Sequence, residues 1–217
     1  MTSRVQRFTQ VWLELAAGGD PEPVAKDLLA RWSEPQRHYH TINHLDHCLA
    51  GLDRHCALAV NAPVLEAALW FHDAVYDPHA PDNETRSAAL ARKVLTHANV
   101  ASSRVDRIEQ LILATRTHES DGSADNALLL DLDLSVLGAS PADYSRYAEA
   151  IRQEYAWVPE ADYRHKRAAV LRRFLDRPTL FLTPPFHQLY EAQARHNLAA
   201  EIKRMTFGAS TQSKSSL

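Results

Sequence analysis

Helical periodicity recurs along almost the whole chain and constrains its fold more than any other feature. In one stretch, Ile42, Leu45, Leu49 and Leu52 follow one another at steps that place them on one face of an α-helix. Glycine is scarce, with six in 217 residues, and runs of β-branched residues are rare. The pattern predicts an all-α bundle of roughly eight to ten helices.

Helix-start signals punctuate this pattern. Asp20-Pro21 and Ser140-Pro141 each combine an N-cap side chain with a proline in the first turn, and Thr41 can cap a helix that begins at Ile42. We expect one domain over residues 1–207 and a disordered tail over residues 208–217, which are small and polar. Residues 119–126 form a predicted loop. The predicted helices cover residues 4–17, 21–33, 42–60, 63–76, 84–97, 104–118, 127–138, 141–157, 159–176 and 186–205.

Charge and composition exclude several classes of function. The formal net charge is −3 and the isoelectric point is about 6.4, so the chain lacks the basic footprint of a nucleic-acid-binding protein. No apolar run reaches the roughly 18 residues of a membrane span, and the N-terminus lacks a signal-peptide pattern. We therefore expect a cytoplasmic protein whose two cysteines, Cys48 and Cys56, are reduced thiols on one helix.

Three apolar helices contain polar side chains that a plain hydrophobic core would not include. His44 lies in the helix 42–60, His72 and Asp73 lie in 63–76, and Asp131 and Asp133 lie among leucines in 127–138. Each has an ordinary explanation, since a histidine near a helix start can be a cap and the aspartates can begin a helix. Taken together, however, buried carboxylates need a partner, and one divalent cation bound by neutral imidazoles and carboxylates would satisfy all three helices.

The order of these residues, and the segments around them, resemble the HD superfamily of metal-dependent phosphohydrolases. RHYHTINHLDHC is similar to the family's first metal-binding helix, LWFHDAVYD to its central His-Asp helix and LLLDLDLSVLG to its final aspartate helix. RWSEPQRHYH, DNETRSAALA and IRQEYAWVPEADYRHKRAAVLRRFL extend the resemblance over residues 31–205. It implies an HD-type helical bundle.

The resemblance also implies a set of site residues. His44, His72, Asp73 and Asp133 would bind a divalent ion (Mn, Ni, Co, Fe, Zn or Mg), and Asp133 is preferred to Asp131 because Asp133-Leu134 matches the family's Asp-Leu. His40, Glu84 or His118 would supply the proton to the leaving oxygen, and Asp73 would orient the attacking water or accept its proton. His118 is a secondary candidate as an extra metal ligand, and Arg86 as an anion contact.

The expected function is hydrolysis of a phosphoester in a nucleotide or another small phosphorylated metabolite, by a metal-activated water. Two alternatives stay open: a dinuclear-iron HD oxygenase, for which His118 would be essential, and a non-catalytic HD domain that binds a nucleotide or a partner protein. The chain contains no Walker-type loop, G-x-S-x-G elbow or CxxC zinc pattern, so those chemistries are disfavoured. A homodimer is compatible with the sequence.

Overall fold

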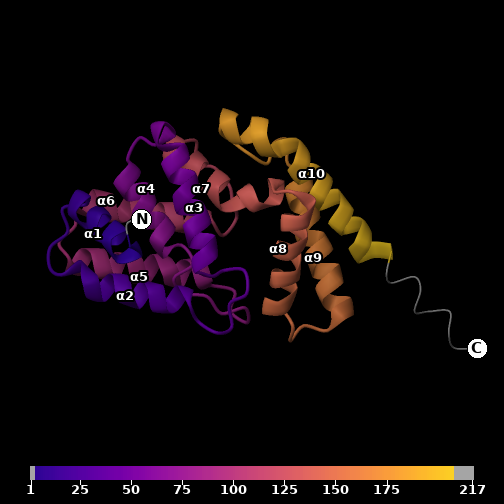
Figure 1. Cartoon of the computed structure of the whole chain (residues 1–217), viewed down its shortest axis with the longest axis horizontal. Helices are drawn as coiled ribbons and strands as arrows, with labels where there is room; N and C mark the ends of the chain where they lie inside the picture. The colour runs from indigo at the N-terminus through magenta and orange to yellow at the C-terminus, as the bar shows by residue number, and fades with distance from the viewer. Residues whose placement is uncertain (1–2, 208–217) are drawn as a thin grey trace, which may run out of the picture. The chain divides into compact units, whose positions relative to one another are not determined.

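The computed structural model describes residues 3–207, and every regular element in that range is helical (Figure 1). The ten α-helices found in this described range confirm the predicted all-α bundle of eight to ten helices. The predicted tail, residues 208–217, lies outside the described residues. The α-helices are α1 (Arg4–Glu14), α2 (Pro21–Trp32), α3 (Ile42–Arg54), α4 (Ala62–Phe71), α5 (Asn83–His97), α6 (Ser102–Ala114), α7 (Ala124–Leu134), α8 (Pro141–Glu154), α9 (Glu160–Leu175) and α10 (Pro184–Phe207); two 3₁₀ helices are η1 (Cys56–Leu58) and η2 (Ser135–Gly138).

Contacts divide the chain into two compact units, one ending at Asp133 and the other beginning at Leu134. All candidate site residues belong to the first unit. Because compact units can belong to one domain or to two, the expectation of a single domain over residues 1–207 stays a prediction.

Helix α4 is the central helix of the first unit and contacts α1, α3, α5 and α6 (Figure 1). Seven of its residues are buried: Val64, Leu65, Ala67, Ala68, Leu69, Trp70 and Phe71. A helix that is apolar all round needs neighbours on every side, and this one has them. The ring of Phe8 on α1 meets that of Trp70 edge-on at 5.2 Å. Packing on every side therefore fixes the position of the C-terminal end of α4.

Helices α3 and α7 approach each other closely. Gly51 makes this approach feasible, because a Cβ at that position would collide with the Leu132 side chain. The Cys48 thiol, one turn earlier on α3, lies 3.9 Å from the Leu132 carbonyl oxygen. This packing brings the buried face of α3 beside the last turn of α7.

Several helix ends near these contacts differ from the prediction. Helix α4 ends at Phe71 instead of residue 76, because the main chain after His72 finds partners outside the helix: Arg37 donates to the Asp73 carbonyl oxygen at 2.8 Å. The Ser87 hydroxyl accepts from the Val75 amide at 3.0 Å. Helices α3 and α6 are also shorter than predicted, ending at Arg54 and Ala114.

Helix α7 begins three residues before the predicted position. The Ser123 hydroxyl accepts from the Asn126 amide at 3.3 Å, so residues 124–126, predicted as loop, form the first turn. Helix α3 gives way to η1, so Cys56 does not lie on the same α-helix as Cys48. Both cysteines are free thiols, as expected, with Cys48 buried and Cys56 exposed.

The second unit packs α10 against α9 and η2. The Glu201 carboxylate, fully buried on α10, accepts a hydrogen bond from the Tyr144 hydroxyl and one of 2.9 Å from Arg167. Asn197 donates to the carbonyl oxygens of Leu137 and Ala139 at 2.8 and 2.9 Å. These buried polar contacts fix the orientation of α10 within the unit.

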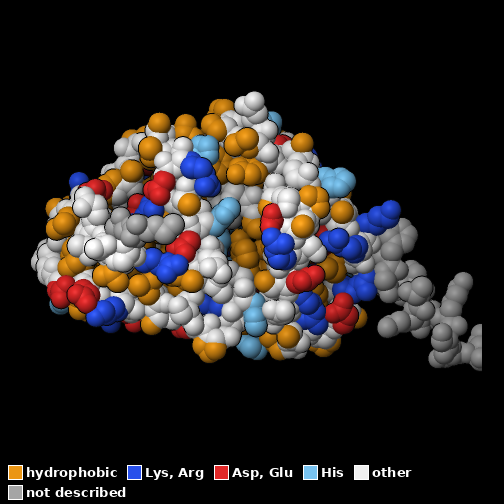
Figure 2. All heavy atoms as spheres, in the orientation of Figure 1, with side chains coloured by type: hydrophobic (Ala, Val, Ile, Leu, Met, Phe, Trp, Pro, Cys, Tyr) orange, Lys and Arg blue, Asp and Glu red, His pale blue; other side chains and the backbone are white. Residues whose placement is uncertain are grey.

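Within residues 3–207, no helix has the length and apolar character needed to cross a membrane. On the face drawn in Figure 2, acidic and basic side chains are interspersed among apolar ones.

Candidate metal centre

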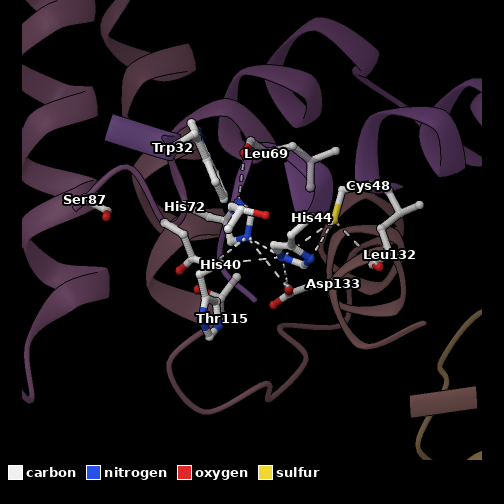
Figure 3. A network of polar contacts seen from close by, with 12 residues as sticks. Trp32, His40, His44, Cys48, Leu69, His72, Ser87, Thr115, Leu132 and Asp133 are labelled. Atoms are coloured by element: carbon white, nitrogen blue, oxygen red, sulfur yellow. Dashed lines mark hydrogen bonds and ion pairs between the residues drawn. The ribbon is translucent and has the colours of Figure 1, made fainter. Parts of the chain in front are cut away.

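Three helices of the first unit direct polar side chains to one buried point (Figure 3). His44 lies in the first turn of α3, which the Thr41 side chain caps by accepting from the Asn43 amide. His72 is the C-cap of α4, and Asp73 follows it directly. Asp133 lies in the last turn of α7. Less backbone surrounds a helix end than a helix centre. Three helix ends can therefore converge around a small volume.

The two imidazoles and two carboxylates lie within a few ångströms of one another. His44 Nε2 is 3.2 Å from His72 Nε2 and 3.0 Å from Asp133 Oδ1, and His72 Nε2 is 3.7 Å from Asp133 Oδ1. Asp73 Oδ2 is 3.2 Å from His72 Nε2 and 4.0 Å from His44 Nε2. The side chains are almost buried: the histidines are 1% exposed and the aspartates 14%.

These separations suit a coordinated ion. Two ligand atoms at about 2.1 Å from one ion lie about 3.0 Å apart at a right angle and about 3.4 Å apart at the tetrahedral angle. His44, His72 and Asp133 form a group that could hold a metal ion, with ligand atoms all within 4.8 Å of one another. Asp73 lies at the edge of this group, beside His72.

The orientation of His72 fits a metal ligand in a second way. Its Nδ1 lies 2.8 Å from the Leu69 carbonyl oxygen and donates to it, since a carbonyl can only accept. The other ring nitrogen, Nε2, is thereby directed at His44 and the carboxylates. Metal-bound histidines are held in this way by a hydrogen bond from the second nitrogen.

Electrostatics favour ionised carboxylates at this point. Burial alone would raise the pKa of Asp73, but the charge and hydrogen bond of His72 outweigh it, and the pKa falls below its usual value. Burial likewise opposes ionisation of Asp133, whose pKa is nevertheless held well below its usual value by hydrogen bonds with His118, His44 and His72. Against its own burial, the two carboxylates raise the pKa of His72 well above its usual value. A cation would therefore displace a proton from His72.

Of the two aspartates on α7, Asp133 and not Asp131 makes the contacts described above. Asp131 is completely buried, two residues away and on a different side of the helix. Among residues 3–207, the group that could hold a metal ion includes Asp133 and not Asp131.

His118 lies closer to the site than the sequence indicated. It follows the end of α6 with a φ of 52°, in the left-handed region, and its Nε2 lies 2.9 Å from Asp133 Oδ2. The two oxygens of Asp133 thus face different histidines. A helix continuing to His118, as predicted, would not have produced this backbone turn.

The remaining predicted residues differ in their proximity to the site. The ring of His40 stacks on that of Tyr76 at 4.3 Å, and the charge of His40 contributes to the lowered pKa of Asp73. Glu84 lies in the first turn of α5, half-buried, and Arg86 is exposed. No hydrogen bond or ion pair found within residues 3–207 joins either of these two to the four ligand candidates.

Two further residues at the site were not singled out from the sequence. Cys48 Sγ lies 3.9 Å from both ring nitrogens of His44. Arg37 is buried beside the chain that carries Asp73. A cysteine one turn after His44 on the same helix face could have been found from helical spacing. Arg37 donates to main-chain carbonyls, and such hydrogen bonds produce no recognisable pattern in the sequence.

Comparisons with protein-family models, with curated proteins and with solved structures found no match to this chain.

Proposed function

We propose that the chain is a divalent-metal-dependent hydrolase of phosphoester bonds, of the HD-superfamily type that its motifs resemble. The observation that supports this best is the convergence of His44, His72, Asp73 and Asp133 from three helices, with His72 Nε2 held toward the group by the Leu69 carbonyl. Two imidazoles and two carboxylates form a ligand set that suits Mn, Ni, Co, Fe or Zn, and Mg less well, and that leaves coordination positions for other ligands.

Each side chain has a role in such a reaction. A cation bound here would lower the pKa of a coordinated water and offset charge on the phosphoryl group. Asp73, whose low pKa keeps it ionised, can orient the attacking water by accepting a hydrogen bond from it. His40, whose ring stacks on that of Tyr76 and whose charge influences Asp73, would give a proton to the departing oxygen. Glu84 stays a candidate for the same step.

The proposed substrate is a nucleotide or another small phosphorylated metabolite of the cytoplasm. The carboxylates are 14% exposed and the histidines 1% exposed, so a substrate would approach the site from the side of the carboxylates.

Metal analysis combined with a substrate screen tests this proposal. Protein purified without chelator is analysed for bound metal and assayed against phosphomonoesters and phosphodiesters with Mn²⁺, Ni²⁺, Co²⁺, Mg²⁺ and Zn²⁺. We expect hydrolysis with at least one ion. Asp73→Ala should abolish it and retain the helical circular dichroism, whereas Asp46→Ala, on α3 but paired with exposed Arg4, should keep it. Absence of both bound metal and hydrolysis would refute the proposal.

One observation favours a second candidate, a dinuclear-iron oxygenase. Asp133 Oδ1 faces His44 and Oδ2 faces His118, so His118 would be available with Asp133 to hold a second ion, which would supply the redox chemistry of such an enzyme. Two irons per chain, oxygen-dependent turnover and loss of the second iron in His118→Ala would support this candidate over the first. One metal per chain bound equally by His118→Ala would exclude it. Metal binding without any turnover would instead indicate a non-catalytic domain that binds a nucleotide or a partner protein.

A further inference from the structure

Arg37 is a buried cation that does not belong to the candidate ligand set. It contacts two chain segments beside that set, the turn before α3 and the chain that follows α4. Its side chain is completely buried. Nη1 donates to the carbonyl oxygens of His40 at 3.0 Å and Asp73 at 2.8 Å, and Nη2 reaches that of Ala74 at 3.4 Å. Nε donates to the Glu34 carboxylate at 3.1 Å. One guanidinium thus joins the turn before α3 to the chain that leaves α4.

Two aromatic rings flank the guanidinium. Its central carbon lies 5.5 Å from the Trp32 ring and 5.3 Å from the Tyr76 ring, within the range of cation–π attraction. Both rings also pack against histidines of the site. The centroid of the Trp32 ring lies 5.4 Å from that of His72, and the Tyr76 ring stacks on His40 with 4.3 Å between the ring centroids. The Trp32 indole is itself fixed by donating to the Trp70 carbonyl oxygen at 3.0 Å.

The position of this cation follows from where α4 ends. Past Phe71 the carbonyls of Asp73 and Ala74 have left the helix, in a buried region where an unpaired carbonyl would cost about 1–3 kcal/mol. A guanidinium supplies several donors in a fixed planar fork, and its charge suits the negative end of a helix. A lysine ammonium in the same space could not reach three carbonyls and Glu34 together.

We propose that Arg37 is the positioning residue of the candidate metal centre. By holding the main chain at Asp73 and at His40, it directs the Asp73 carboxylate and the His40 imidazole toward the same point. Within residues 3–207, the hydrogen bonds of Arg37 are to main-chain carbonyls and to Glu34, and none is to a coordinating atom of the ligand candidates, so Arg37 acts through the backbone. The inference rests on the proposed metal site and adds to it a residue outside the ligand set.

Arg195 offers a matched control in the second unit. It donates to the carbonyl oxygens of Leu175, Arg177 and Pro178 at 2.9, 2.8 and 2.9 Å, and to the Glu191 carboxylate at 2.7 Å. It therefore makes the same kinds of bond as Arg37, far along the chain from the ligand candidates. Arg195→Lys therefore shows how the loss of a guanidinium that bonds several carbonyls affects folding, without a change near the ligand candidates.

The test measures Co²⁺ affinity by chelator competition, and the Co²⁺ visible absorption spectrum, in wild type, Arg37→Lys and Arg195→Lys. Removal of an outer group that orients metal ligands weakens binding about 10- to 100-fold. We expect a loss of that size and an altered spectrum in Arg37→Lys, with wild-type affinity and spectrum in Arg195→Lys. Equal affinity in wild type and folded Arg37→Lys would overturn the inference and leave the metal centre standing.

Two further results are informative. If the wild-type chain binds no Co²⁺, the metal centre itself fails and the inference fails with it. If Arg37→Lys lacks the helical circular dichroism of wild type, Tyr76→Leu takes its place, since it removes one flanking ring and leaves the guanidinium. That variant should bind Co²⁺ several-fold more weakly, and wild-type affinity in it would overturn the inference.

Discussion

Replacing Asp133 and Asp131 separately with asparagine distinguishes a metal ligand from a buried structural carboxylate on the same helix. Asp133 Oδ1 lies 3.0 Å from His44 Nε2, whereas Asp131, two residues earlier on the same helix, is completely buried. Asparagine keeps the shape and one oxygen but removes the charge. Each variant should therefore change a different property of the protein.

The size of the effect follows from the number of ligands. A four-ligand zinc site contributes about 10–16 kcal/mol of binding free energy, which is about 2.5–4 kcal/mol per ligand. Four candidate side chains converge here, so Asp133→Asn should weaken binding of a divalent ion roughly 100- to 1,000-fold. Asp131→Asn should leave the affinity unchanged and lower the free energy of unfolding by about 1–3 kcal/mol, the cost of disturbing a buried polar group.

Chelator competition with Zn²⁺ or Co²⁺ gives the affinity, and urea unfolding of the metal-free proteins gives the stability. The reverse result, with binding lost in Asp131→Asn and kept in Asp133→Asn, would mean that α7 faces the site differently. Wild-type affinity in both variants would refute a ligand on α7.

Three further variants test the packing of the second unit. Tyr144→Phe should lower the free energy of unfolding by about 1–3 kcal/mol, because it leaves the buried Glu201 carboxylate without this donor; a change near zero would contradict the buried network. Tyr163→Phe should change the free energy of unfolding little at neutral pH, since the Tyr163 hydroxyl is buried without a hydrogen-bond partner in the described chain. Burial raises the pKa of Tyr163 to about 12, so its contribution to stability is present below pH 10 and lost as the pH rises toward 12. The wild type should therefore lose more stability than Tyr163→Phe over that interval in urea unfolding, and parallel losses would contradict the shift. Gly138→Ala should destabilise the chain by about 1–3 kcal/mol in thermal unfolding, because its Cβ would meet the Tyr190 main chain at 2.9 Å, and wild-type stability would show that α10 can move.

The fold was largely predictable because its determinants are local. Asp20, Thr41 and Ser140 cap the helices whose starts they indicated. Helix ends near the site were not predictable, because tertiary contacts decide them: the Arg37 guanidinium and the Ser87 hydroxyl take over main-chain groups that a longer α4 would have paired within itself.

The same distinction between local and tertiary determinants applies to the residues of the candidate site. A site that joins His44, His72 and an aspartate of α7 could be predicted because polar residues in apolar helices are costly without a partner. The choice of Asp133 rested on the resemblance to the HD superfamily, and the structure brings Asp133 together with the two histidines. The approach of His118 depends on a left-handed residue after α6, which no side-chain pattern announces. Glu84 was predicted from its place in a motif, and the structure shows no bond between it and the site within residues 3–207.

Anomalous diffraction from crystals grown with Mn²⁺ or Co²⁺ tests the central claim most directly. Data collected at the absorption edge of the metal locate the ion independently of any assumption about its ligands. We expect one strong peak about 2.0–2.2 Å from Nε2 of His44 and His72 and from carboxylate oxygens of Asp73 and Asp133. A map without a peak at this point, or with the metal bound by other residues, would contradict it.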